Sequence, residues 1–143
     1  MKRSTRGLTL LELTVTVAII AIVSVAGALT MSSVLAGRLE AEARALVADL
    51  RWARQRAVAS RADYLIVLDS AQKRYTIYLG SIDSANLVKQ RSVAVEAIAV
   101  TPNAPVVFTA PRGLTNQSIQ TITLTDRGRT MQVTIFGETG YVK

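Results

Sequence analysis

The sequence predicts an α+β protein in which one long N-terminal α-helix, partly a membrane anchor and partly amphipathic, packs on a C-terminal antiparallel β-sheet domain. Three observations lead to this prediction. A long apolar run near the N-terminus contains no Asp, Glu, Lys or Arg from Leu13 to Gly37. An apolar stripe with helical spacing follows between Arg38 and Arg61, and β-rich runs fill the rest of the chain. A helical run followed by a series of strands is typical of α+β folds.

The apolar run has the sequence properties of a membrane anchor. An apolar stretch of about 18 or more residues is long enough to span a bilayer as a helix. A basic head with Lys2, Arg3 and Arg6 precedes it, which favours a cytoplasmic N-terminus. The run exceeds the apolar part of a cleaved secretory signal, and the small residue Gly7 stands before it rather than after it. Cleavage after Gly7 would remove residues 1–7 and leave residues 8–37 as a transmembrane helix.

Residues 38–61 are predicted to continue the helix as its amphipathic half. They contain no Gly or Pro, the residues that most disfavour a helix interior. Apolar residues recur at spacings of three and four, which places them on one narrow stripe of a helix. The stripe contains Leu39, Ala43, Leu46, Leu50, Ala53 and Ala57. One helix is therefore expected from about Leu8 to Ser60, with its second half packed inside a globular domain of residues 38–143.

Residues 62–143 are predicted to form six or seven short strands of an antiparallel sheet. The runs DYLIVLD and RYTIYLG are rich in β-forming residues and are separated by a short SAQK segment, as in a hairpin. Alternation of apolar and polar residues continues in residues 88–100, and residues 105–113 combine a short strand with a Pro–Gly turn. Residues 120–137 indicate two strands joined at Asp126-Arg127-Gly128, and Tyr141-Val142 a last short one. Residues 80–86 are expected to form a mobile loop.

The composition argues against an enzyme. The chain has neither cysteine nor histidine, so thiolate chemistry and the commonest general base and metal ligand are missing. Its Ser and Asp residues are scattered, without a recognisable pairing of nucleophile and base. We therefore expect no catalytic residue, no metal and no cofactor. A membrane-anchored hydrolase is the rival class.

The segment Gly7-Leu-Thr-Leu-Leu-Glu-Leu13 resembles the type III signal of type IV pilins and type II secretion pseudopilins. The resemblance implies that prepilin peptidase cuts after Gly7 and that the new N-terminal residue, Leu8, is N-methylated. It also implies that Glu12 is the glutamate that stands fifth in the mature chains of this family. Most of these chains carry a proline where this one has Leu29.

Glu12 needs a partner, because a lone carboxylate in a membrane segment costs roughly 2.5–3.5 kcal/mol. After cleavage, the amine of Leu8 would lie one helical turn away. Glu12 could pair with that amine in its own chain, or with the amine of a neighbouring subunit in a filament. Removing one partner of a buried ion pair costs about 3–5 kcal/mol. Glu12 is therefore predicted to fix where one subunit docks on another.

The globular half is similar to the GspH/FimT-type minor pseudopilins in three places. The helix ends in a Leu-Arg-x-Ala-Arg pattern at residues 50–54, Phe108 and Gly113 resemble a Phe-x-x-x-Gly pattern with one extra residue, and residues 139–142 match Thr-Gly-x-Val. The resemblance implies a minor pseudopilin of a type II secretion pseudopilus. The alternative it leaves open is a FimT-like minor pilin of a type IV pilus, contributing to DNA uptake or adhesion.

The resemblance also implies partners and location. The chain would wait in the bacterial inner membrane with its N-terminus in the cytoplasm and its globular domain outside. It would contact prepilin peptidase/methyltransferase, an inner-membrane assembly platform, and other pilins or pseudopilins through its N-terminal helix. Extraction into a filament would exchange lipid for neighbouring helices.

The positive charge of the chain raises the question of nucleic-acid binding. The net charge is +7, and Arg112, Arg127, Arg129 and Lys143 are the candidate contacts for phosphate in expected turns or the tail. The alternative is a solvated face with salt bridges between subunits. FimT-like pilins that bind DNA end in Gly-Arg-x-Arg, whereas this chain ends in Gly-Tyr-Val-Lys. We therefore expect only weak, non-specific binding of nucleic acid.

Two further features of the helix carry open alternatives. Trp52 points away from the apolar stripe on a helical wheel, so it is either an exposed anchor for a protein contact or is covered by the sheet or a loop. Glu42 and Asp49 share one helix face at a spacing of seven residues. They could bind a cation or belong to an ordinary polar face.

Overall fold

The computed structural model describes residues 9–143, without the side chains of residues 26–36. Helix α1 (Leu10–Ser60) confirms the prediction of one helix over both halves of the N-terminal region. Its last residue is followed by Arg61 in the left-handed region, with φ of 51°, a common way for a helix to end. The structure divides into two compact units at residues 36 and 37, and each unit is described by itself.

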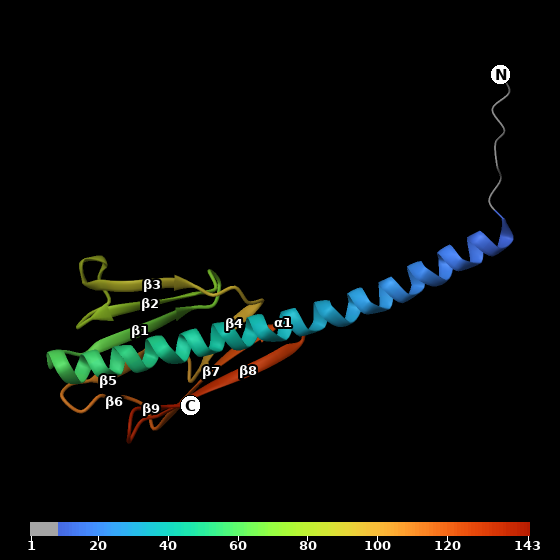
Figure 1. Cartoon of the computed structure of the whole chain (residues 1–143). Helices are drawn as coiled ribbons and strands as arrows, with labels where there is room; N and C mark the ends of the chain where they lie inside the picture. The colour runs from blue at the N-terminus through green and yellow to red at the C-terminus, as the bar shows by residue number, and fades with distance from the viewer. Residues whose placement is uncertain (1–8) are drawn as a thin grey trace. The chain divides into compact units, whose positions relative to one another are not determined.

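The unit of residues 37–143 contains two antiparallel sheets rather than the expected one (Figure 1). The first has the strand order β3-β2-β1-β5-β6 and the second the order β4-β7-β8-β9. The first sheet consists of β1 (Tyr64–Asp69), β2 (Arg74–Leu79), β3 (Leu87–Ser92), β5 (Val106–Thr109) and β6 (Leu114–Thr115). The second sheet consists of β4 (Ala97–Thr101), β7 (Ile119–Asp126), β8 (Arg129–Phe136) and β9 (Tyr141–Val142).

The predicted strand segments and both hairpins are confirmed, but the structure has more strands than the sequence predicts. The described residues contain nine strands, because the run of residues 88–100 divides into β3 and β4 in different sheets, and β6 has only two residues. Two residues are too few to produce a visible alternation of apolar and polar side chains. The expected loop of residues 80–86 contains a short 3₁₀ helix, Ser84–Asn86.

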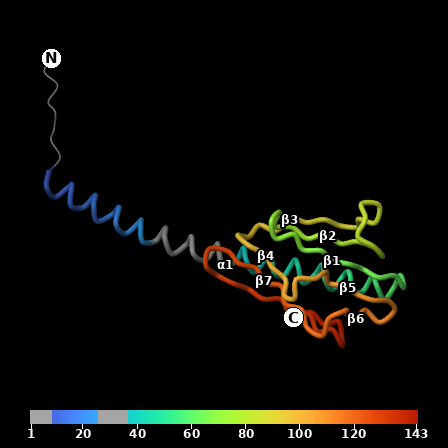
Figure 2. Tube along the Cα trace, turned by 180° about the vertical axis from the view of Figure 1, so that it is seen from behind, coloured from blue at the N-terminus to red at the C-terminus, as the bar shows by residue number. Residues whose placement is uncertain are grey.

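One hydrophobic core joins the helix to both sheets. All six apolar residues of the predicted helix stripe are buried, none of them more than 3% exposed. They pack in one cluster with Ile66 and Ile77 of the first sheet and Ile122 and Ile135 of the second. The helix lies in front of the strands in Figure 1 and behind them in the opposite view of Figure 2. Burial of each large apolar side chain contributes roughly 1.5–3 kcal/mol, so the stripe fixes which helix face meets the sheets.

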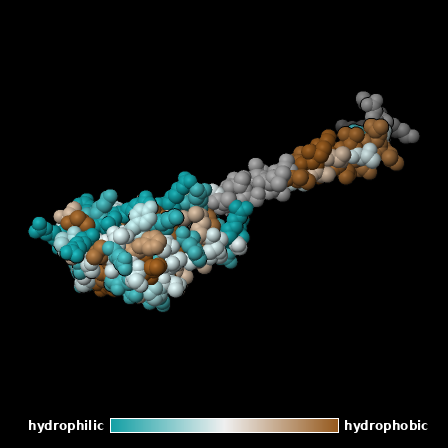
Figure 3. Space-filling model, turned by 90° about the horizontal axis from the view of Figure 1, so that it is seen from below, coloured by the Kyte–Doolittle hydropathy of each residue, from teal (hydrophilic) through white to brown (hydrophobic). Residues whose placement is uncertain are grey.

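Residues 10–25 of α1 present a largely apolar helix surface on all sides. Every large apolar residue of α1 up to Val25 is exposed, with Leu10 at 81% and Val15 at 49%, and Figure 3 shows this segment as predominantly hydrophobic. A helix that is apolar all round normally lies in lipid or among other helices. Among the described residues, no helix combines the length and the apolar character required to cross a membrane.

Candidate functional site

Glu12 lies in the first turn of α1, at a helix start that matches the spacing of a capping box. Thr9 precedes the helix, its carbonyl accepts the backbone N–H of Leu13, and its hydroxyl accepts the N–H of Glu12 at 3.2 Å. The spacing Thr-x-x-Glu is the signature of such a helix start, and a carboxylate there also interacts favourably with the helix dipole. The Glu12 side chain is exposed and so is accessible to an amine of another chain. Gly7 and Leu8, the predicted processing residues, lie outside the described residues.

The hydroxyl groups of Thr14, Thr16 and Ser24 are already satisfied within the helix. Thr14 donates to the carbonyl of Leu11 at 2.9 Å, and Thr16 donates to that of Glu12 at 2.6 Å. An unpaired hydroxyl in an apolar environment would be costly. In the described residues 10–25, the Glu12 carboxylate has no such bond inside its own helix. If this segment is buried among lipid or other helices, the carboxylate needs a partner from outside.

Two arginines of the Leu-Arg-x-Ala-Arg pattern connect the helix to the C-terminal segment. Arg51 Nη2 donates to the carbonyl of Val142 at 3.0 Å. Arg54 Nη2 donates to the carbonyl of Thr139 at 2.6 Å, and its Nε donates to that of Gly113 at 3.3 Å. Hydrogen bonds from charged donors contribute about 1.5–3 kcal/mol each. These arginines therefore hold residues of the same chain, a role that the Leu-Arg-x-Ala-Arg pattern does not reveal by itself.

Two glycines allow this close approach. Gly113 and Gly140 have φ of 64° and 61°, which glycine adopts without a steric penalty. A Cβ atom at position 140 would lie 2.0 Å from the carbonyl oxygen of Gly113 and 2.7 Å from Arg54 Nε. The three short patterns that the sequence shares with minor pseudopilins thus meet at one place, where Arg54 bridges the turn at Gly113 and the segment Thr139-Gly140. We call this contact the Arg54 junction.

Glu42 and Asp49 are both ion-paired with strand β3. Glu42 Oε2 lies 3.3 Å from Arg91 Nη2, and Asp49 Oδ1 lies 2.6 Å from Lys89 Nζ. Asp49, only 8% exposed, also accepts a hydrogen bond of 2.6 Å from the Tyr75 hydroxyl. Burial, together with this hydrogen bond, raises the pKa of Tyr75 well above its ordinary range. The two carboxylates thus attach the edge strand β3 to the helix, which the sequence pattern left open.

The four basic residues named as candidate phosphate contacts do not come together. Arg112 lies in the turn between β5 and β6, and Arg127 and Arg129 lie at the turn between β7 and β8. Lys143 pairs through its backbone with Thr134, five residues along β8 from Arg129, which is roughly 17 Å at ~3.4 Å per residue. Lys143 instead lines a hollow of about 370 Å³ together with Arg44 and Arg51.

Comparison with known families supports the sequence resemblance. Residues 42–139 match the family described as "Type II transport protein GspH". The chain belongs to the GspH family. Residues 2–28 also match the family described as "Prokaryotic N-terminal methylation motif", so this GspH-family chain carries the N-terminal motif that the resemblance predicted. No curated protein sequence matches the chain.

Two kinds of solved structure share the fold of the GspH-family chain. The type IV minor pilin FimU of Pseudomonas aeruginosa aligns with a TM-score of 0.61 and 21% identity, covering 75% of this chain and 87% of FimU. The minor pseudopilin EpsH from the Type 2 Secretion System of Vibrio cholerae aligns with a TM-score of 0.57 and 14% identity, covering 74% of this chain and 94% of EpsH. The fold of a long helix packed on antiparallel sheets is therefore shared with minor pilins and with minor pseudopilins.

Trp52 of the GspH-family chain is partly covered, between the two alternatives that the sequence left open. Its ring meets Tyr64 edge to face with centroids 6.1 Å apart, and the guanidinium carbon of Arg56 lies 5.5 Å from the Trp52 ring centroid. It also packs against the core. The helical wheel places Trp52 away from the stripe, but it carries no information on β1, which contacts Trp52 through Tyr64.

An apolar hollow on the second sheet was missed by the sequence interpretation. Phe136 and Tyr141 stack with centroids 6.3 Å apart and, with Ile119, line a hollow of about 630 Å³. Tyr141 is 51% exposed and Ile119 53%. Aromatic residues in short strands usually indicate a core position, so the strand pattern gave no signal that these side chains face outward.

Proposed function

We propose that the chain is a minor pseudopilin of a type II secretion pseudopilus, a structural subunit rather than an enzyme. In this proposal it is inserted in the bacterial inner membrane and then extracted into a filament that drives protein export. The match to the GspH family over residues 42–139 is the observation that carries the proposal. The exposed apolar surface of α1 up to Val25 supports it, because this surface requires lipid or other helices around it.

Glu12 and the processed N-terminus have defined roles in this proposal. Prepilin peptidase cleaves after Gly7, the Leu8 amine is methylated, and that amine pairs with the Glu12 carboxylate of a neighbouring subunit. Lipid and helix surfaces are similarly apolar, so packing and polar contacts decide between the membrane and the filament. The exposure of Glu12 and the internal hydrogen bonds of the neighbouring threonines support this role for the carboxylate.

The first test concerns processing. The intact mass of the protein extracted from membranes is expected to correspond to a chain that begins at Leu8 and carries one added methyl group. The same measurement on a Gly7→Leu variant should give the full-length mass, because the peptidase site is lost. A mature chain that begins at any other residue would contradict the proposed processing.

The second test concerns assembly. Glu12→Ala should insert in the membrane at least as well as the wild type, because the costly carboxylate is gone, whereas its incorporation into filaments should fall strongly. Thr14→Ala is the matched control, since it removes a hydroxyl that bonds within its own helix. Membrane fractions and sheared filaments are compared by quantitative immunoblotting. If Glu12→Ala enters filaments at the wild-type level, Glu12 does not set the subunit register.

A minor-pilin role in a type IV pilus is the second candidate, and the fold likeness to FimU favours it. Under this alternative the chain would serve a pilus that contributes to adhesion or DNA uptake. The two candidates differ in the major subunit that surrounds the chain. Mass spectrometry of filaments isolated through an affinity tag on this chain identifies that subunit: a secretion-type pseudopilin supports the first candidate, a type IV major pilin the second.

A further inference from the structure

Four exposed basic side chains gather at one end of the 37–143 unit. They are Arg38, Lys73, Arg127 and Arg129, which we call the basic rim. None of them forms an ion pair with another described residue. By contrast, Arg74 and Arg91 nearby are paired with Asp69 and Glu42. The rim therefore presents positive charge that the described part of the chain does not neutralise by direct pairing.

Backbone and side-chain contacts place these residues at the same end. Arg91 at the end of β3 meets Glu42, one turn along the helix from Arg38. The N–H of Val93, just after β3, donates to the carbonyl of Lys73 at 2.8 Å. Three residues after Val93, the carboxylate of Glu96 accepts the backbone N–H of Arg127 at 3.0 Å. The β7–β8 turn therefore lies at the same end.

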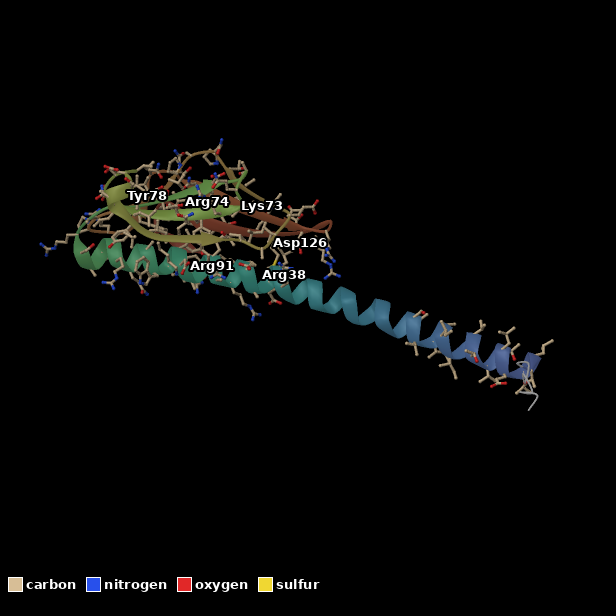
Figure 4. The ribbon with its side chains drawn as sticks, turned by 90° about the horizontal axis from the view of Figure 1, so that it is seen from above. Arg38, Lys73, Arg74, Tyr78, Arg91 and Asp126 are labelled. Carbon is tan, nitrogen blue, oxygen red and sulfur yellow. The ribbon has the colours of Figure 1, made fainter. Side chains whose placement is uncertain are left out.

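Figure 4 shows Arg38, Lys73 and Asp126, which precedes the β7–β8 turn, at this end of the unit. The Glu96 carboxylate, which accepts the backbone N–H of Arg127, and that of Asp126 lie beside the rim, and the four basic groups outnumber these two carboxylates. The end also has a defined position in the chain, because the unit begins at Gly37, next to Arg38. The rim therefore includes Arg38, the first charged residue of this unit.

Two of the rim residues occupy backbone positions that favour glycine or asparagine. Lys73 and Arg127 have φ of 50° and 47°, in the left-handed region that is unfavourable for side chains other than those of Gly, Asn and Asp. Each lies in the turn of a hairpin, β1–β2 and β7–β8. Sparsely populated backbone conformations that persist can point to function. Here they carry two long basic side chains at two turns of the 37–143 unit.

We propose that the basic rim docks on anionic lipid headgroups of the membrane that holds the apolar segment, and this inference rests on the proposed membrane anchor. If residues 8–37 cross the membrane, Arg38 is the first charged residue beyond it. Lys73, Arg127 and Arg129 lie at the same end of the unit as Arg38, so the proposed docking brings all four to the same headgroups. Basic residues close to an anionic membrane each strengthen association by roughly five-fold. Docking would orient the globular unit before the subunit leaves the membrane.

Lys73 serves as the reporter of this contact in the full-length protein. The chain is incorporated in lipid nanodiscs that contain either phosphatidylcholine alone or a mixture with phosphatidylglycerol, and the acetylation rate of each lysine is measured by mass spectrometry. Lys73 is expected to react more slowly in the anionic discs and to regain its rate at high salt. Lys143, also exposed but distant from the rim along β8, should react equally in both discs.

The variants separate the rim from the general charge of the protein. Arg127→Asn suits the backbone at that position, and together with Arg129→Gln it should lower the docking constant by roughly 25-fold, about five-fold per charge. Arg61→Asn is the matched control, because Arg61 is exposed, also has a positive φ, and lies at the opposite end of the unit's helix. It should leave the protection of Lys73 unchanged.

Three results would overturn the inference. Equal reactivity of Lys73 in neutral and anionic discs excludes lipid docking while leaving the anchor intact. A chain that does not enter neutral discs contradicts the proposed function, and with it the docking that depends on the anchor. Protection of Lys73 by a short DNA duplex near physiological salt, without protection by anionic lipid, would assign the rim to nucleic acid instead.

Discussion

Replacing Gly140 with alanine tests whether the Arg54 junction holds the C-terminal segment on the helix. The new Cβ atom would lie 2.0 Å from the carbonyl oxygen of Gly113 and 2.7 Å from Arg54 Nε. Both are far inside van der Waals contact, and the first atom belongs to the backbone, so it cannot rotate away as a side chain could. The turn at Gly113 must therefore move by about 1 Å, which loosens the hydrogen bonds that Arg54 donates.

Three effects contribute to the expected loss of stability. The left-handed conformation of residue 140, with φ of 61°, costs an alanine about 1–2 kcal/mol. Forcing an extra methyl group into a packed site costs about 1–3 kcal/mol. Weakening the hydrogen bonds from Arg54 costs a further share of their ~1.5–3 kcal/mol. Because relaxation will recover part of the total, we expect a decrease of about 3–5 kcal/mol in the free energy of unfolding.

Gly80→Ala is the matched control for this experiment. Gly80 has φ of 76°, and no atom lies within 4 Å of the position that a Cβ atom would take there. The substitution therefore introduces backbone strain without a clash and should cost about 1–2 kcal/mol. Unfolding of the full-length protein in detergent is followed by the fluorescence of Trp52, the one tryptophan of the chain. If Gly140→Ala and Gly80→Ala destabilise the protein equally, within about 0.5 kcal/mol, the close packing at the Arg54 junction has no energetic importance.

Two other predictions follow from the charged groups. Because the pKa of Tyr75 is higher in the folded state than its unfolded value of about 10, its contribution to stability is complete below pH 10 and decreases above it, by about 1.4 kcal/mol per pH unit. Alkaline unfolding curves of Tyr75→Phe should lack this component, and an unchanged slope would contradict the buried phenol. For nucleic acid, a salt titration of the full-length protein with a short duplex should give a steeply salt-dependent Kd no tighter than about 10⁻⁴–10⁻⁶ M near physiological salt. Submicromolar binding abolished by neutralising Arg127, Arg129 and Lys143 together would contradict it.

Much of the fold could be predicted because its signals are local. The stripe from Leu39 to Ala57 predicted the buried helix face, and the absence of Gly and Pro predicted that the helix continues to Ser60. The Asp126-Arg127-Gly128 turn predicted the β7–β8 hairpin, in which Asp126 pairs with Arg129. Helical periodicity and tight turns depend on residues a few positions apart, so one sequence is enough to recognise them.

The division into two sheets could not be predicted in the same way. It depends on where the chain turns between Ser92 and Ala97, and on which strand finds which partner across long separations. The pairing of Tyr64 with Phe108 shows such a separation. Strand β3 is exposed along nearly its whole length, whereas β4 alternates between exposed and buried residues, and neither pattern indicates which strand it will pair with.

For the candidate site, the sequence by itself determined the chemical character of the N-terminal region: an apolar helix surface and one carboxylate, Glu12, that needs a partner. These follow from residue type and spacing along a single helix. Only the tertiary structure decided what the other charges do. It directs Arg51 and Arg54 to carbonyls of the C-terminal segment, pairs Asp49 with Lys89, and leaves the basic rim unpaired at one end. Such partners are tens of residues apart in sequence, and only folding brings their atoms within the few ångströms over which hydrogen bonds and ion pairs act.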